Sequence, residues 1–147
     1  MKKKKVLFIC IHNSSRSQIA EELVNKYASD ILEAKSAGYN PTSINPIVAD
    51  VLEKEEQIDI RHNSLDNIFK LCENCKDKNF DYVISVCNLE RVGVSPLFPG
   101  TAHKIEWDFA DPSKFVGEYE YKYQKIYELY KDIKKEVFKF IELVRAS

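Results

Sequence analysis

The sequence lacks both a long apolar segment and a large net charge of either sign. None of its 147 residues belongs to a stretch long enough to span a membrane. The apolar run 6–11 that follows the basic residues 1–5 is too short for the core of a signal peptide, so we expect a solvated N-terminal arm. Lys and Arg (22) nearly balance Asp and Glu (23). The resulting formal net charge of −1 excludes a global field that would recruit nucleic acid or an anionic membrane surface.

Internal repeats, linkers and low-complexity segments are also missing. The hydrophobic share of 44% is sufficient for a core, so we expect a single domain over residues 1–147 that is monomeric. Without an export signal, the expected location is the cytoplasm. There, four cysteines indicate thiol chemistry or metal binding rather than structural disulfides. The three histidines, His12, His62 and His103, are not spaced as a metal cluster, and no metal site is expected.

Strand and helix patterns alternate along the chain. Apolar, β-prone runs predict strands at 6–10, 31–36, 80–87 and 104–109. Helical spacing predicts helices capped by Ser17, Asn45 and Ser64, and a long helix over 118–146. The tyrosine-rich stripe of this last helix suits packing across a sheet, and the alternative is a partner helix. The alternation predicts an α/β fold, a three-layer sandwich in which helices cover both faces of a four-stranded parallel sheet.

A polar loop between the first strand and the next helix holds the clearest chemical signal. Cys10 and Arg16 are separated by five residues, and this loop length allows successive backbone N–H groups to point inward around an oxyanion. The helix N-terminus adds unpaired donors and a positive dipole end. Arg16 offers a planar fork of donors that matches two oxygens of a tetrahedral anion. These surroundings favour the thiolate form of Cys10, which makes it a candidate nucleophile.

The remaining loop residues complete the expected oxyanion cradle. We assign to it the whole segment after the cysteine: Ile11, His12, Asn13, Ser14, Ser15, Arg16 and Ser17. Ser17 is best placed to donate a hydrogen bond to the Cys10 thiolate. Asn13 tolerates the left-handed backbone that a tight curl needs. For Ser14 and Ser15, ordinary solvation of the loop is an equally good interpretation.

The sequence from Cys10 to Glu22 resembles the signature of low-molecular-weight protein tyrosine phosphatases and of the arsenate reductases built on the same fold. Further matching motifs extend the resemblance over nearly the whole chain: SAG at 36–38, NP at 45–46, IDIRHNS at 58–64, DYVISVC at 81–87, FPG at 98–100 and EWDFADP at 106–112. The resemblance implies the sheet order 2-1-3-4. It also implies that Asp111, in the Asp-Pro pair, is the general acid.

Two features favour the reductase branch. Phosphatases of this family commonly carry aromatic residues after the Asp-Pro pair, whereas Ser113 and Lys114 follow here. In the implied sheet order the strands that end at Cys10 and Cys87 are neighbours, and both cysteines lie at the edge where ligands bind. The resemblance therefore implies attack of Cys10 on arsenate, proton donation by Asp111, and a Cys10–Cys87 disulfide as arsenite leaves. The alternative for Cys87 is a buried cysteine at the end of a strand.

The sequence departs from thioredoxin-coupled members of the family at one position. These members usually carry a third cysteine just before a proline, and here Ser95 precedes Pro96. The auxiliary thiols Cys72 and Cys75 are expected on the third helix, toward the opposite edge of the sheet. They are candidate core thiols, with a redox shuttle or a zinc site as alternatives.

We therefore expect an arsenate reductase with no tightly bound cofactor, recharged by an external thiol reductant of the thioredoxin or glutaredoxin type. One alternative is a phosphatase acting on phosphotyrosine or another phosphomonoester. A second alternative is a non-enzymatic module that binds a phosphoanion, although such a module would not need Asp111.

Overall fold

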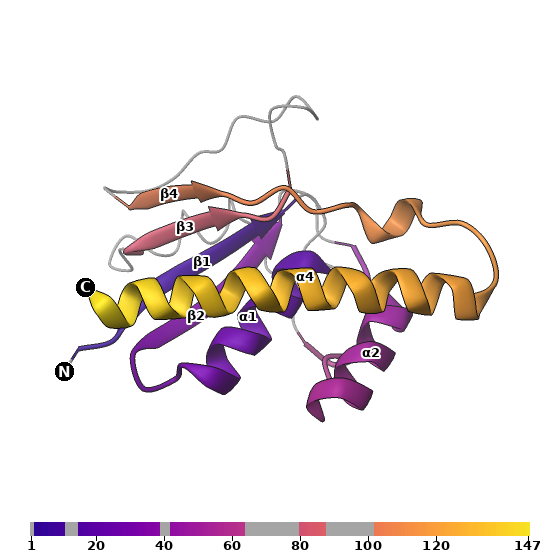
Figure 1. Ribbon diagram of the computed structural model, residues 1–147, viewed down its shortest axis with the longest axis horizontal. Coiled ribbons are helices and arrows are strands. Elements are labelled where there is room, and N and C mark those ends of the chain that lie inside the picture. Colours follow the sequence, from indigo (N-terminus) through magenta and orange to yellow (C-terminus); the bar gives the residue numbers. More distant parts are fainter. Residues whose placement is uncertain (1, 11–14, 39–41, 64–79, 88–101) are drawn as a thin grey trace.

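The protein is built on a four-stranded parallel sheet. The computed structural model describes residues 2–10, 15–38, 42–63, 80–87 and 102–147. The strands are β1 (Lys4–Cys10), β2 (Leu32–Gly38), β3 (Tyr82–Ser85) and β4 (His103–Glu106). They lie in the order β2-β1-β3-β4 (Figure 1). The α/β class, the parallel sheet and the strand order are therefore confirmed.

The central strand β1 sets the position of the site. Its residues 6–10 are all buried, because it has a paired strand on each side. Cys10 is opposite Gly38 of β2, and Ile9 is opposite Ser85 of β3. The carboxyl ends of β1, β2 and β3 therefore meet at one edge of the sheet, which is where α/β proteins bind ligands.

The described helices pack together on one side of the sheet, and α4 crosses the view in front of the strands (Figure 1). They are α1 (Arg16–Tyr27), α2 (Pro46–Glu56) and α4 (Tyr119–Ala146), and a short 3-10 helix, η1 (Pro112–Lys114), precedes α4. Phe140 of α4 lies edge-on to Tyr82 of β3, with 5.0 Å between ring centroids. The long helix thus packs across the sheet as expected.

A buried carboxylate connects the three α-helices. Glu56 ends α2, and its side chain is 1% exposed. It accepts hydrogen bonds from Tyr27 and Lys26 of α1, at 2.6 and 2.9 Å, and from Tyr130 and Lys134 of α4, the latter at 2.7 Å. Burial alone would raise the pKa of Glu56, but these four donors outweigh it and lower the pKa to about 2.

Several helix boundaries were predicted well and one was wrong. Asn45 caps α2 as expected, since its Oδ1 accepts from the N–H groups of Ile47 and Val48, and Pro46 is the first helical residue. Ser17 does not cap α1. The N-cap is Ser15 and the helix begins at Arg16, two residues earlier than predicted, and the Ser17 hydroxyl faces Cys10 instead. The helix predicted after Ser64, with Cys72 and Cys75, lies outside the described residues.

The strands β3 and β4 are shorter than the apolar runs that predicted them. The predicted run 80–87 contains a ladder of only four residues, although Val86 and Cys87 beyond it are buried. β4 is likewise limited to 103–106, and Trp107 to Phe109 continue past it. The apolar run 80–87 therefore marks burial, and its paired strand occupies only part of it, whereas residues 104–109 alternate between exposed and half-buried positions.

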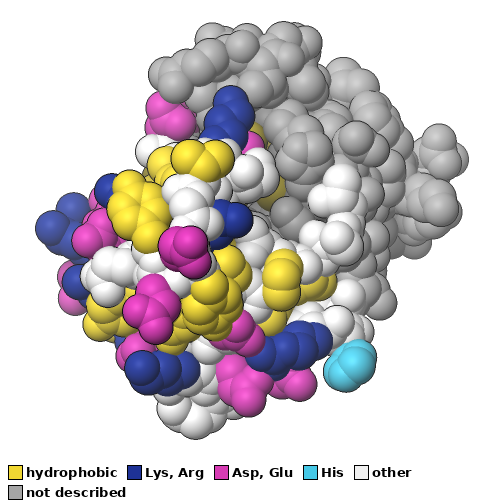
Figure 2. Space-filling view, turned by 90° about the vertical axis from the view of Figure 1, so that its right-hand side faces the viewer, with side chains coloured by type: hydrophobic (Ala, Val, Ile, Leu, Met, Phe, Trp, Pro, Cys, Tyr) yellow, Lys and Arg dark blue, Asp and Glu magenta, His cyan; other side chains and the backbone are white. Residues whose placement is uncertain are grey.

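Charges of both signs alternate over the surface where α4 begins. Figure 2 shows Lys and Arg side chains beside Asp and Glu side chains on this end of the molecule, with hydrophobic groups between them. The arrangement agrees with the balanced composition and presents no single-sign field there. In the described ranges, no helix is both long and apolar enough to cross a membrane.

Candidate active site

Cys10 and Ser17 form the centre of the candidate site. Cys10 ends β1 and is 2% exposed, and Ser17 lies in the first turn of α1 and is fully buried. The Cys10 Sγ and Ser17 Oγ atoms are 3.1 Å apart, the contact expected from the sequence. A hydroxyl that donates to this sulfur stabilises a thiolate more than a thiol. Ser15 makes no side-chain capping bond, so its hydroxyl does not occupy the first N–H groups of α1.

Arg16 is held by the segment that leads to Asp111. The side chain of Arg16 is 8% exposed, and its Nη1 donates to the backbone carbonyl of Phe109 at 2.9 Å. Its Nη2 lies 3.9 Å from Oδ1 of Asp111. The guanidinium has five N–H donors, so one bond to Phe109 leaves further donors for a tetrahedral anion. Arg16 and Asp111, 95 residues apart in their numbering, therefore share one site.

Asp111 is itself oriented by the residue two positions further on. Its Oδ1 accepts from the Ser113 backbone N–H at 3.0 Å and from the Ser113 hydroxyl at 2.8 Å. The Asp111 side chain is 26% exposed, which leaves it accessible from solvent. Asp111 is also the N-cap of η1, and Pro112 begins that helix. The sequence did not predict the contacts of Phe109 or Ser113.

An aromatic cluster supports the segment from 107 to 111. Trp107 lies 5.8 Å from Phe8 of β1, 6.3 Å from Phe140 of α4 and 6.1 Å from Phe109, measured between ring centroids. The Trp107 N–H donates to the Ser85 carbonyl at 2.7 Å, which continues the alignment beyond β4. The alternation of Trp107, Phe109 and Asp111 was visible in the sequence as a motif, but its packing function was not.

Cys87 lies just beyond β3, next to the strand that ends in Cys10. It is a buried thiol, 6% exposed. The Val86 N–H donates to the Ile9 carbonyl at 3.0 Å, so Val86 continues the alignment of β3 with β1. Adjacent strands of a sheet lie about 4.8 Å apart, so the segment that follows β3 begins beside the end of β1.

Some expected site residues lie outside the described part of the chain. These are Ile11, His12, Asn13 and Ser14 of the loop, the auxiliary thiols Cys72 and Cys75, and Ser95. The described parts of the chain contain no group of three or more His, Cys, Asp or Glu residues arranged to hold a metal ion.

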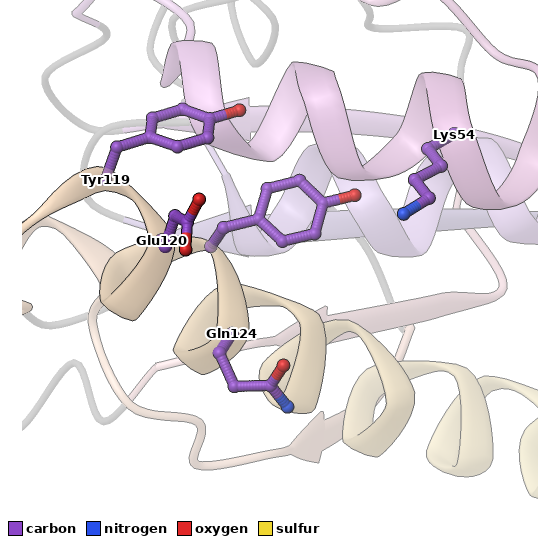
Figure 3. A pocket seen from close by; sticks show the side chains of 5 residues that line it. Lys54, Tyr119, Glu120 and Gln124 are labelled. Carbon is purple, nitrogen blue, oxygen red and sulfur yellow. The ribbon is translucent and has the colours of Figure 1, made fainter.

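A separate pocket of about 460 Å³ lies between α2 and the start of α4. Lys54 of α2 and four residues of α4 line it, namely Tyr119, Glu120, Tyr123 and Gln124. Figure 3 shows Tyr119, Glu120 and Gln124 on one helix and Lys54 on another. Burial raises the pKa of Tyr123, whose hydroxyl has no hydrogen-bond partner among the described residues. None of the described lining residues is a cysteine or an arginine, and none of them belongs to the Cys10 site.

Known arsenate reductases are similar to this chain in sequence and in fold. An arsenate reductase of Halalkalibacterium halodurans is 32% identical over 142 residues, which cover 97% of this chain and 98% of that protein. A solved arsenate reductase in the oxidized state superposes with a TM-score of 0.76 at 26% identity, over 96% of this chain and 98% of that one. A thioredoxin-dependent arsenate reductase of Corynebacterium glutamicum gives a TM-score of 0.58 at 28% identity, over 96% of this chain and 63% of that chain.

A family description covers almost the full sequence. The model of the low molecular weight phosphotyrosine protein phosphatases matches residues 5–147, which include β1 except Lys4, the loop after it and Asp111. Since this match spans the fold and every residue of the site described above, the chain belongs to the low molecular weight phosphotyrosine protein phosphatase family.

Proposed function

We propose that this protein is an arsenate reductase in which Cys10 is the nucleophile and Cys87 the resolving thiol. The observation that carries the proposal is the position of Cys87. It directly follows Val86, whose N–H bonds the Ile9 carbonyl near the end of β1, the strand that ends in Cys10. Phosphatase chemistry has no use for a second thiol beside the nucleophile. The similarity to arsenate reductases over nearly the full chain supports the same choice.

The proposed reaction has two steps. The Cys10 thiolate attacks the arsenic atom of arsenate, a sulfur–arsenic bond forms, and one oxygen departs as water after Asp111 donates a proton. The Cys87 thiolate then attacks the Cys10 sulfur. The sulfur–arsenic bond breaks, and its electron pair stays on arsenic, which is reduced from As(V) to As(III) and leaves as arsenite. The two cysteines are oxidised together to a disulfide.

The site residues have separate functions in this scheme. Arg16 and the backbone donors at the start of α1 bind the oxyanion, and Ser17 donates to the Cys10 thiolate. Asp111 is the proton donor. Its Oδ1 atom lies 3.9 Å from Nη2 of Arg16, so the proton donor and the guanidinium that binds the anion are in one site. Residues 11–14 are assigned to the same cradle on the basis of the sequence.

An external dithiol of the thioredoxin or glutaredoxin class restores the thiols, and no tightly bound cofactor is needed. The thioredoxin dependence of the similar Corynebacterium glutamicum enzyme supports this class of reductant. Reduction by such a dithiol fits the reducing cytoplasm, the location expected from the sequence. Because Ser95 stands where a third cysteine is usual, the disulfide relay of thioredoxin-coupled relatives cannot apply unchanged.

The proposal is tested by supplying thioredoxin and glutaredoxin systems in turn and measuring arsenate-dependent consumption of reducing equivalents. We expect consumption with one of them, accompanied by one arsenite per disulfide reduced. The Cys87→Ser variant should lose this activity but keep any hydrolysis of a phosphomonoester such as p-nitrophenyl phosphate. Vigorous hydrolysis by the wild type without any arsenite formation would instead identify a phosphatase, the alternative that the family membership itself supports.

A further inference from the structure

The acid loop of this protein contains a contact that the mechanism above does not use. Oδ1 of Asp111 accepts two hydrogen bonds from the same residue, the backbone N–H and the hydroxyl of Ser113, at 3.0 and 2.8 Å. The Nη2 atom of Arg16 lies 3.9 Å from the same oxygen. Three donor groups thus gather at one carboxylate oxygen.

The two Ser113 bonds differ in what they require of the sequence. The backbone bond forms an Asx turn, which any residue with an N–H at this position supplies. The hydroxyl bond is supplied only by a short side chain such as serine or threonine. It matters because the Asp111 side chain is 26% exposed and the terminal torsion of an aspartate is only weakly restrained by itself.

Donors gathered at Oδ1 determine which oxygen transfers the proton. The two hydrogen bonds from Ser113 occupy the acceptor sites of Oδ1, so the proton of the acid form resides on the other oxygen, Oδ2. Rotation of the carboxyl group would exchange the two oxygens. The hydrogen bond from the Ser113 hydroxyl opposes this rotation and keeps the acidic O–H of Asp111 pointing one way. Proton transfer to a departing oxygen requires such a fixed orientation.

We propose that Ser113 is a positioning residue that orients the carboxyl group of Asp111 for proton donation during arsenate reduction. The inference rests on the proposed function, in which Asp111 is the acid. It also gives a chemical meaning to the residue that follows Asp111-Pro112, where phosphatases of the family commonly have an aromatic side chain. Here the position serves the acid instead of lining a pocket for an aryl group.

The test is a double-mutant cycle measured in a single turnover of the reduced protein with arsenate, which needs no external reductant. Ser113→Ala should lower the maximal rate of arsenite release by about threefold to tenfold, the usual effect of one lost hydrogen bond, and leave the half-saturating arsenate concentration unchanged. Ser113→Thr should restore most of the rate. Asp111→Asn should lower the rate by about a hundredfold or more.

The decisive comparison is Ser113→Ala in the Asp111→Asn background. If Ser113 acts through Asp111, this second change should cause no further loss of rate. Ser147→Ala is the matched control, because it removes a hydroxyl that bonds the Val144 carbonyl at the far end of α4, at 2.8 Å. The control should keep the wild-type rate.

Two results would overturn the inference alone: a wild-type rate for Ser113→Ala, or the same fold loss in both backgrounds, which would mean a merely structural role. A wild-type rate for Asp111→Asn would overturn the acid assignment in the proposed function and this inference with it. The failures of the two proposals are therefore distinguishable.

Discussion

At the residue scale, the short contact between Cys10 and Ser17 is the first testable part of the site. Ser17→Ala removes a hydroxyl 3.1 Å from the Cys10 sulfur, so the sulfur loses this hydrogen-bond partner. We expect alkylation of Cys10 by iodoacetamide near pH 7 to slow by about threefold to tenfold. Peptide mass spectrometry measures the rate, and Ser17→Thr is the control that keeps a hydroxyl. Equal rates for all three proteins would show that the contact has no effect on the thiol.

Arg16 allows a second prediction at this scale. Lysine carries the same charge but no planar fork, and it cannot both donate to the Phe109 carbonyl and clamp two oxygens of an anion. Arg16→Lys should therefore weaken the binding of inorganic phosphate by about tenfold or more. Isothermal titration calorimetry measures the affinity, with far-ultraviolet circular dichroism as the check on folding. An unchanged affinity would argue against the clamp.

The residues of the site differ in how far the sequence could predict them. Cys10, Arg16 and Ser17 are close in sequence, so their spacing alone indicated an oxyanion site. The bond from Arg16 to Phe109 uses a backbone carbonyl 93 residues away, and a carbonyl has no sequence signature. The Ser113 hydroxyl bond depends on a side-chain torsion, although the Asp-Pro-Ser order permits it.

At the element scale, Glu56 is the main connection between helices. Glu56→Gln retains the shape of the side chain but loses the charge that pairs with Lys26 and Lys134, at 2.9 and 2.7 Å. Removing one partner from a buried network leaves the others poorly solvated. We expect the free energy of unfolding to fall by about 2 to 4 kcal/mol.

Denaturant unfolding measures this change, and the neighbouring Glu55→Gln is the matched control. Glu55 is only partly buried, so the same substitution there should change the free energy by less than about 0.5 kcal/mol. Similar effects at both positions would mean that the buried network adds little to stability.

The elements were predicted to different degrees. α4 was expected over 118–146 and runs from Tyr119 to Ala146, because its apolar stripe faces the core for most of its length. At the beginning of α4 the stripe does not face the core, since Tyr119 is 52% exposed. The start of α1 was misplaced because a serine near a helix N-terminus serves either as a cap or as a donor to a site, and local sequence does not distinguish the two.

At the scale of the whole molecule, the Glu56 network predicts an acid limit to stability. The pKa of Glu56 is about 2 in the folded protein and 4.5 ordinarily, so the folded state binds the proton more weakly than the unfolded state. The contribution of Glu56 is therefore present above about pH 4.5 and is lost as the pH falls toward 2.

Urea unfolding between pH 5 and about pH 2 tests this prediction. The free energy of unfolding of the wild type should fall by up to about 1.4 kcal/mol per pH unit more than that of Glu56→Gln. Parallel curves for the two proteins would contradict the pKa shift. Asp30 and Asp59, whose pKa values are also lowered, are present in both proteins and cancel in the comparison.

Arsenate reduction by the proposed mechanism requires the Cys87 sulfur to lie beside the Cys10 sulfur. The sheet order brings the ends of β1 and β3 together, and the sequence predicted this order only through a family resemblance. Composition and periodicity alone indicate a parallel sheet but do not specify its strand order.

The most direct test of that claim is to identify the disulfide formed in one turnover. Reduced protein is mixed with one equivalent of arsenate, quenched with acid, alkylated and mapped by peptide mass spectrometry. The account predicts a peptide that joins Cys10 to Cys87, in equal amount to the arsenite released. Arsenite release while Cys87 stays alkylatable, or with Cys87 joined mainly to Cys72 or Cys75, would contradict it.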